Sequence, residues 1–164
     1  MATYHVLYNP NAGNGKGKPD AEKLRELMAG DTLHFYDMTA ISDYRSFFDG
    51  LPSGDRFMIA GGDGTLNRFV NDTREMTLPG DLYYFATGSG NDFLHDLGKN
   101  KGDAPFCINE YVRDLPSVTV NGKDYLFLNG IGYGIDGYCC EVGDQHRLKS
   151  NKPVNYTSIA IKGL

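Results

Sequence analysis

Residues 56–70 read RFMIAGGDGTLNRFV, and in them an apolar run passes directly into a glycine-rich turn and then into a helical pattern. The run at residues 56–60 is typical of a short buried strand. Leu66, Phe69 and Val70 then recur at the spacing of one helix face. A strand, a glycine-rich turn and a helix in this order predict one unit of an α/β protein with a parallel sheet.

The same unit occurs on both sides of residues 56–70. We expect three further strands, each followed by a loop and a helix, at residues 3–8, 33–38 and 82–86. Pro19 suits the first turn of one of these helices, and Ser42 is the expected N-cap of the next. The four units predict a parallel sheet with helices on both faces, in which ligands bind beyond the carboxyl ends of the strands. Three glycine-rich loops fall at those ends, at residues 9–17, 61–65 and 87–93.

The pattern changes after Pro105. Residues 117–120 and 124–128, joined by Asn121-Gly122, predict an antiparallel hairpin. A lone hairpin cannot bury its own apolar face, and residues 156–164 resemble an unfinished helix, so we expect a truncated chain. The predicted organisation is an α/β domain at residues 1–113 and the beginning of a truncated, β-rich second domain at residues 114–164.

Composition and charge exclude several classes of protein. The 164 residues carry a formal net charge of −5, which gives no general attraction to nucleic acid or to anionic membranes. The N-terminus lacks the layout of a signal peptide, and no apolar run approaches the ~20 residues that span a bilayer. Three cysteines and four histidines show neither a disulfide framework nor metal-ligand spacing. These features favour a cytoplasmic protein.

The turn at residues 61–65 has the chemistry of a phosphate site. Its glycines let a phosphate approach the backbone, and Gly64 and Thr65 open a helix whose free N–H groups attract anions. Asp63 would repel a bare phosphate, so its presence implies a magnesium ion or a hydroxyl proton nearby. The alternative is an ordinary strand-to-helix turn in which Asp63 is the N-cap.

The other two glycine-rich loops offer related chemistry. Residues 9–17 resemble a phosphate loop but lack its Gly-Lys-Ser/Thr ending. Residues 87–93 offer the hydroxyl of Ser89 and the amide of Asn91, although Asn91 or Asp92 could equally be a helix N-cap. Three such loops at one sheet edge predict a nucleotide site.

In order along the chain, Asn9-Pro10-x-x-Gly13, Gly-Gly-Asp-Gly-Thr at residues 61–65 and Gly-Ser-x-Asn-Asp-Phe at residues 88–93 resemble the diacylglycerol kinase catalytic domain. Bacterial lipid kinases, sphingosine kinases and ceramide kinases share that domain. The resemblance covers residues 1 to about 140 and implies a fold similar to NAD kinase and phosphofructokinase. It also implies an ATP-dependent lipid kinase, which transfers the γ-phosphoryl group to the hydroxyl of diacylglycerol or a related lipid.

Carried over position by position, the resemblance implies an ATP site formed by Asn9, Pro10, Asn11, Ala12, Gly13, Thr39, Gly62, Asp63, Gly64, Thr65, Leu66, Asn67, Arg68 and Ser89. Asp63 is the implied catalytic residue and metal position, orienting the phosphates directly or through Mg²⁺. Ser89 replaces a more common threonine, and Arg68 stands where an acidic residue is common.

The lipid side of the site is implied only in part. Residues 132–137 resemble a Gly-Phe-Asp-Ala stretch of the family, which would turn Asp136 toward the lipid head group. A helix N-cap is the alternative role for Asp136. The family's general base and main metal carboxylates belong to its second domain, beyond this chain, so we expect the isolated fragment to be inactive.

The implied cofactors are ATP and Mg²⁺. The implied partner is a lipid at a membrane surface, so the protein would be cytoplasmic or peripheral at the membrane, with a homodimer as one option and no nucleic acid. Two alternatives remain open: an NAD kinase, which also uses Gly-Gly-Asp-Gly-Thr, and a nucleotide-binding module without catalysis.

Overall fold

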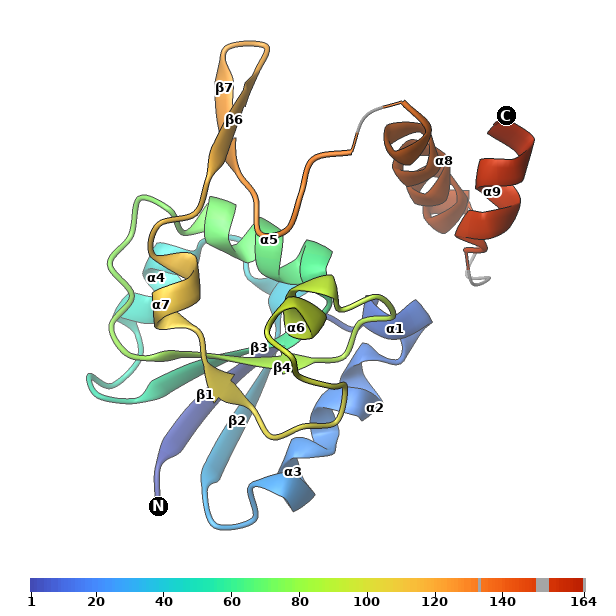
Figure 1. The fold of residues 1–164 in the computed structure, drawn as a ribbon. Helices are drawn as coiled ribbons and strands as arrows, with labels where there is room; N and C mark the ends of the chain where they lie inside the picture. Colours follow the sequence, from blue (N-terminus) through green and yellow to red (C-terminus); the bar gives the residue numbers. More distant parts are fainter. Residues whose placement is uncertain (133, 150–153, 164) are drawn as a thin grey trace. The chain divides into compact units, whose positions relative to one another are not determined.

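The computed structural model describes residues 1–132, 134–149 and 154–163. These residues form two compact units, Met1–Leu128 and Asn129–Leu164. The first unit contains every strand of the described chain, and the second contains two helices (Figure 1).

A five-stranded sheet forms the centre of the first unit. Its strands are Thr3–Tyr8 (β1), Thr32–Asp37 (β2), Arg56–Gly61 (β3), Leu82–Ala86 (β4) and Phe106–Cys107 (β5), in the order β2-β1-β3-β4-β5. The first four are parallel, and β5 pairs antiparallel with β4. Tyr8 pairs with both Asp37 and Ala60, and Gly61 pairs with Ala86, so the four parallel strands end at one edge. The predicted parallel sheet is confirmed, with one short antiparallel strand at its side.

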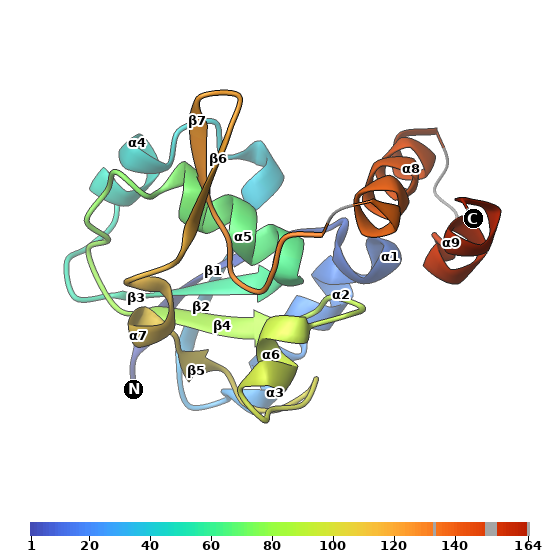
Figure 2. The same cartoon turned by 45° about the horizontal axis from the view of Figure 1, so that its top comes forward.

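Helices cover both faces of this sheet (Figure 2). On one face, Ala21 of α2 (Gly17–Glu22) and Leu24 of α3 (Leu24–Leu27) pack with Val6, Met58 and Phe85 of the strands. On the other face lie α4 (Tyr44–Asp49), α5 (Asp63–Asp72) and α6 (Asp92–Asp96), whose cluster includes Leu7, Phe48, Ile59, Leu66, Phe69, Tyr84, Phe93 and Leu94. The strands are apolar on both sides because both faces are covered. The predicted α/β class is confirmed.

Two details of the predicted helices differ from the structure. The region around Pro19 is not one helix but three short segments, α1 (Ala12–Gly15), α2 and α3, and within α1 both Gly13 (φ 56°) and Asn14 (φ 58°) are left-handed. The N-cap of α4 is Asp43 rather than Ser42. The Asp43 carboxylate accepts hydrogen bonds from the Ser46 hydroxyl and from the backbone N–H groups of Arg45 and Ser46. These hydrogen bonds, above all that of the Ser46 hydroxyl, hold the pKa of Asp43 below its usual value.

The predicted hairpin is present as Ser117–Val120 (β6) and Lys123–Leu126 (β7). Asn121 (φ 52°) and Gly122 (φ 76°) form its two-residue turn with the positive φ angles of type I′. Asn71 at the end of α5 donates to the carbonyl of Leu126 at 2.9 Å and accepts from its N–H at 2.9 Å. The hairpin is therefore fixed to the rest of the first unit through α5.

The short helix Asn109–Val112 (α7) completes the first unit, and Leu115 and Leu128 pack against the same cluster as α5. The two compact units are divided after Leu128, by contacts within this chain. The predicted domain boundary between residues 113 and 114, and the predicted β-rich second domain, stay predictions.

The second unit consists of Ile135–Lys149 (α8) and Tyr156–Gly163 (α9), which pack against each other and bury Ile159. Cys139 and Cys140 of α8 are free thiols, as is Cys107 of β5. In the part of the chain that the structure describes, no helix has the length and apolar character to span a membrane.

Candidate functional site

The three glycine-rich loops lie side by side at the carboxyl edge of the sheet. We call residues 9–17, 61–65 and 87–93 the first, second and third loops; they follow β1, β3 and β4, which are neighbours in the sheet. Figures 1 and 2 both show α1 and α6 together at the ends of these strands. The sequence prediction that these loops converge is confirmed by this topology.

The second and third loops meet backbone to backbone. A Cβ atom added to Gly88 would lie 2.5 Å from Cα of Gly62, and one added to Gly62 would lie 3.0 Å from Cα of Gly88. The Thr87 N–H donates to the carbonyl of Gly61 at 2.8 Å and extends the sheet pairing into the loops. Glycine is required at Gly88 because real Cβ atoms do not approach backbone so closely.

The first loop is joined to both of the others. The Asn9 side-chain amide donates to the hydroxyl of Thr65 at 2.8 Å, and its oxygen accepts from the N–H of Asn11 at 2.9 Å. Gly13 is left-handed (φ 56°), and a Cβ there would lie 2.6 Å from the carbonyl oxygen of Thr87. The three loops are therefore in contact with one another.

Asp63 is held by the third loop. Its two carboxylate oxygens accept hydrogen bonds from the backbone N–H groups of Asp92 and Phe93, each at 3.0 Å. These amides open α6, whose own N-cap Asn91 is left-handed (φ 63°) and makes no side-chain cap. Asp63 thus caps α6, the helix after the third loop. The alternative interpretation of the sequence, in which Asp63 is the N-cap of the helix that follows the second loop, is wrong in this respect. Each oxygen keeps a further lone pair, which a cation could use.

The surroundings of Asp63 include a buried tyrosine beneath the second loop. The Tyr84 hydroxyl donates to the carbonyl of Gly61 at 3.1 Å. Burial, and secondarily the charge of Asp63, raise the pKa of this hydroxyl well above its usual value. Tyr84 therefore stays protonated and serves as a fixed donor that orients the second loop.

Three buried polar atoms at or near the loops have no protein partner among the described residues: Oδ1 of Asn67, Oγ1 of Thr87 and Oδ1 of Asn91. A buried polar atom without a hydrogen bond costs about 1–3 kcal/mol. Thr87 is fully buried, and sequence analysis did not single it out because its burial depends on packing between distant segments. Such atoms favour a water or ligand at the loops.

The structure places the predicted site residues as follows. Asn9, Pro10, Asn11, Ala12 and Gly13 lie in the first loop; Gly62, Asp63, Gly64, Thr65, Leu66, Asn67 and Arg68 lie in the second loop and the first turns of α5; Ser89 lies in the third loop. Gly64, Arg68 and Ser89 are exposed. Leu66 is fully buried in the core, so only its backbone could contact a nucleotide.

One predicted position, Thr39, has no hydrogen bond to the loops within the described residues, and a second, Asp136, cannot be placed by its side chain. Thr39 lies in the 3-10 turn Met38–Ala40 (η1) after β2, and its N–H and hydroxyl both donate to Asp37, at 2.9 and 2.6 Å. Asp136 is the second residue of α8, and its side chain lies outside the described part of the chain.

The metal prediction rests on a single carboxylate. Across residues 1–132, 134–149 and 154–163, no three His, Cys, Asp or Glu side chains are grouped so that they could hold a metal ion. Mg²⁺ in nucleotide sites commonly takes only one or two carboxylates together with substrate phosphates and waters. Asp63, with its free lone pairs beside the glycine backbone, fits that requirement.

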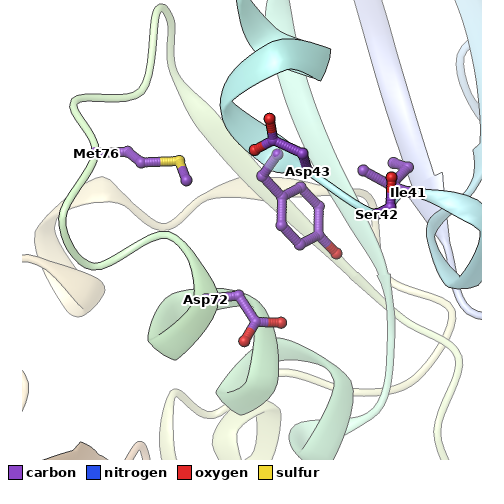
Figure 3. Close-up of a pocket in the computed structure, with 6 residues that line it drawn as sticks. Ile41, Ser42, Asp43, Asp72 and Met76 are labelled. Atoms are coloured by element: carbon purple, nitrogen blue, oxygen red, sulfur yellow. The ribbon is translucent and has the colours of Figure 1, made fainter.

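A pocket of ≈ 330 Å³ lies elsewhere, between the start of α4 and the end of α5 (Figure 3). Its lining residues are Ile41, Ser42, Asp43, Tyr44, Asp72 and Met76. Burial, then the charge of Asp72, raise the pKa of Tyr44 to about 12, against the opposing effect of Arg68. The pocket lies at the opposite end of α5 from Asp63, so it is not part of the glycine-rich loops.

Comparison with known proteins agrees with this arrangement. A model of the diacylglycerol kinase catalytic domain matches residues 3–119, which include all three loops. The diacylglycerol kinase of Bacillus subtilis (strain 168) is 25% identical over 150 residues, in an alignment that covers 80% of this chain and 46% of that protein. The chain thus spans about half the length of this relative. No solved structure gives a significant match. The chain belongs to the diacylglycerol kinase catalytic domain family.

Proposed function

We propose that the three loops bind Mg²⁺·ATP for transfer of the γ-phosphoryl group to a lipid hydroxyl, that of diacylglycerol or a related lipid. The observation that carries this proposal is the meeting of three glycine-rich loops at one sheet edge, where Gly64 and Gly90 are exposed and a Cβ added to Gly64 would meet no atom within 4 Å. Phosphate groups bind such loops because backbone N–H groups can reach the phosphate oxygens without side chains in the way.

The proposed roles follow from the position of each group. Exposed backbone at Gly64 and the Ser89 hydroxyl would contact phosphate oxygens, and Asn9 fixes the first loop against Thr65. Asp63 would hold Mg²⁺, which supplies neutralisation of phosphate charge when it is bound. We propose that Thr39 contacts the nucleotide and that Asp136 contacts the lipid head group, as the family resemblance implies.

We propose the lipid partner, and with it a location in the cytoplasm or at a membrane surface, on the basis of family membership and not of a lipid site in the described residues. A second candidate function is nucleotide binding without transfer. It is favoured by the finding that no three His, Cys, Asp or Glu side chains are grouped as metal ligands in the described part of the chain.

Nucleotide binding can be tested on residues 1–164 by NMR titration of ¹⁵N-labelled protein with Mg²⁺·ATP. We expect weak binding, because the loops supply one wall of the proposed site, with shifts at the amides of Gly13, Gly64 and Ser89. Gly54, before β3, and Gly122, at the hairpin tip, serve as internal controls. Shifts at the controls alone, or none at millimolar nucleotide, would contradict the proposed site.

Transfer is tested with radiolabelled ATP and mixed micelles of diacylglycerol. We expect no labelled lipid from residues 1–164 alone, because water in an open site screens the electrostatic stabilisation that phosphoryl transfer needs. Where the full-length gene product is longer than residues 1–164, it should label the lipid in a reaction that depends on Mg²⁺. Labelling of NAD in a parallel reaction, with none of lipid, would favour an NAD kinase instead.

A further inference from the structure

Lys101 reaches the glycine-rich loops from a segment that belongs to none of them. It lies between α6 and β5, in residues 97–105. Its ammonium group donates to the carbonyl oxygen of Gly88 at 3.0 Å and lies 3.4 Å from that of Thr87. It also lies 3.4 Å from a carboxylate oxygen of Asp20. Asp20 belongs to α2, the helix that follows the first loop, so Lys101 joins the third loop to the segment that carries the first.

These contacts surround the point where the first and third loops meet. A Cβ on Gly13 would lie 2.6 Å from the Thr87 carbonyl oxygen and 3.7 Å from a carboxylate oxygen of Asp20. Two carbonyl oxygens and one carboxylate thus converge on the Lys101 ammonium group, and those of Thr87 and Asp20 also lie near Gly13. Without a cation these negative ends would repel one another and separate the loops.

The Asp20 carboxylate is in the charge state that an ion pair with Lys101 needs. Burial raises the pKa of Asp20, but its hydrogen bonds and ion pairs with Lys23 and Lys101 outweigh burial and leave the pKa below its usual value. The Asp20 side chain is 14% exposed and also pairs with Lys23 at 2.6 Å. Asp20 is therefore a fixed anion for Lys101 at neutral pH.

Lys101 is not a free phosphate ligand in this arrangement. An ammonium group has three N–H donors, and the Lys101 group has three acceptors within reach, on Asp20, Thr87 and Gly88. All of its hydrogen-bonding capacity is directed at the protein. Its action on a ligand must therefore go through the loops.

We propose that Lys101, paired with Asp20, is a positioning residue that holds the first and third loops together and thereby keeps Gly13 and Ser89 placed for the phosphates of a nucleotide. This inference rests on the proposed nucleotide site. Because the Lys101 side chain is 45% exposed, the effect on global stability is small, and the main effect is on the loops.

The test compares Lys101→Met, which keeps the apolar stem and removes the charge, with Lys101→Arg, which restores it. Lys99→Met is the matched control, because Lys99 lies two residues away and its ammonium group packs on the Phe106 ring at 4.6 Å. Amide hydrogen exchange and the Kd for Mg²⁺·ATP are measured for each variant of residues 1–164. In Lys101→Met we expect faster exchange at Gly13 and in residues 88–91, an unchanged Tm, and binding about tenfold weaker.

Lys101→Arg should recover most of the affinity, and Lys99→Met should match the parent protein. The inference is wrong if Lys101→Met leaves both loop exchange and affinity unchanged, or if Lys99→Met has the same effect. Should Lys101→Met fail to fold, Asp20→Asn provides the same comparison by removing only the carboxylate partner. Absence of any Mg²⁺·ATP response in the parent protein would overturn the proposed function instead, while loop exchange would still decide whether Lys101 joins the loops.

Discussion

The Asp63→Asn variant of the full-length gene product is expected to lose about 100-fold or more in kcat for lipid phosphorylation. Asp63 lies among the glycine backbones of the second and third loops and is fixed by the N–H groups of Asp92 and Phe93. In asparagine one oxygen becomes an amide NH₂ group, so the charge available to Mg²⁺ is lost. That NH₂ group would also face a backbone N–H if the side chain kept its position.

A capping carboxylate elsewhere in the chain separates these two effects. Asp43 caps α4 through the N–H groups of Arg45 and Ser46 and lies outside the loops. Asp43→Asn should therefore lower Tm to a similar extent as Asp63→Asn but leave kcat near that of the parent. Near-normal turnover in Asp63→Asn would show that its carboxylate is only a cap, and an equal loss in Asp43→Asn would show that the kinetic effect follows from lost helix capping.

The Gly64→Val variant should abolish Mg²⁺·ATP binding while leaving the fold intact. An added Cβ at Gly64 meets no atom within 4 Å, and Gly64 has no positive φ, so the unliganded protein gives no steric reason for glycine there. A valine side chain would instead occupy the space in front of the backbone where we propose a phosphate. Circular dichroism and Tm should match the parent, whereas the NMR titration should show no response.

Gly88→Ala and Gly62→Val are the contrasting variants. At Gly88 a Cβ would lie 2.5 Å from Cα of Gly62, so alanine must push the second and third loops apart and lower Tm. Gly62→Val crowds the same contact, with a Cβ 3.0 Å from Cα of Gly88, and should lose both binding and stability. If Gly64→Val binds Mg²⁺·ATP with the affinity of the parent, the second loop is a structural turn and not a phosphate site.

Much of the fold could be predicted from sequence because the signals for it are local. The β1 and β4 strands occupy the residues that their apolar runs predict, and the Asn121-Gly122 turn has the expected positive φ angles. The N-cap of α4 was misassigned by one residue because neighbouring serine and aspartate both have cap-forming side chains. The N-cap is the residue whose side chain accepts from the N–H groups of the first helical turn, and the Asp43 carboxylate accepts from two of them.

The candidate site was predicted less completely, because its internal contacts join distant parts of the chain. Glycine-rich loops after strands are visible as a pattern, and the order of strands in a parallel sheet then brings them to one edge. The contacts of Asp63 with the start of α6 span 29 and 30 residues, and that of Lys101 with Asp20 spans 81. No periodicity or motif encodes such pairings, so Lys101 and the buried hydroxyl of Thr87 required the structure.

The link between the hairpin and α5 has a consequence for the order in which the chain can fold. The hydrogen bonds of Asn71 with Leu126 span 55 residues, and β4, α6 and β5 all lie between these two positions. A two-stranded hairpin is marginally stable by itself in water, so β6 and β7 gain lasting order only after that long segment has closed. Loop closure over such a separation is slow compared with the formation of a local turn. The hairpin should therefore be among the last elements to acquire protection during refolding, although its turn is among the strongest local signals in the sequence.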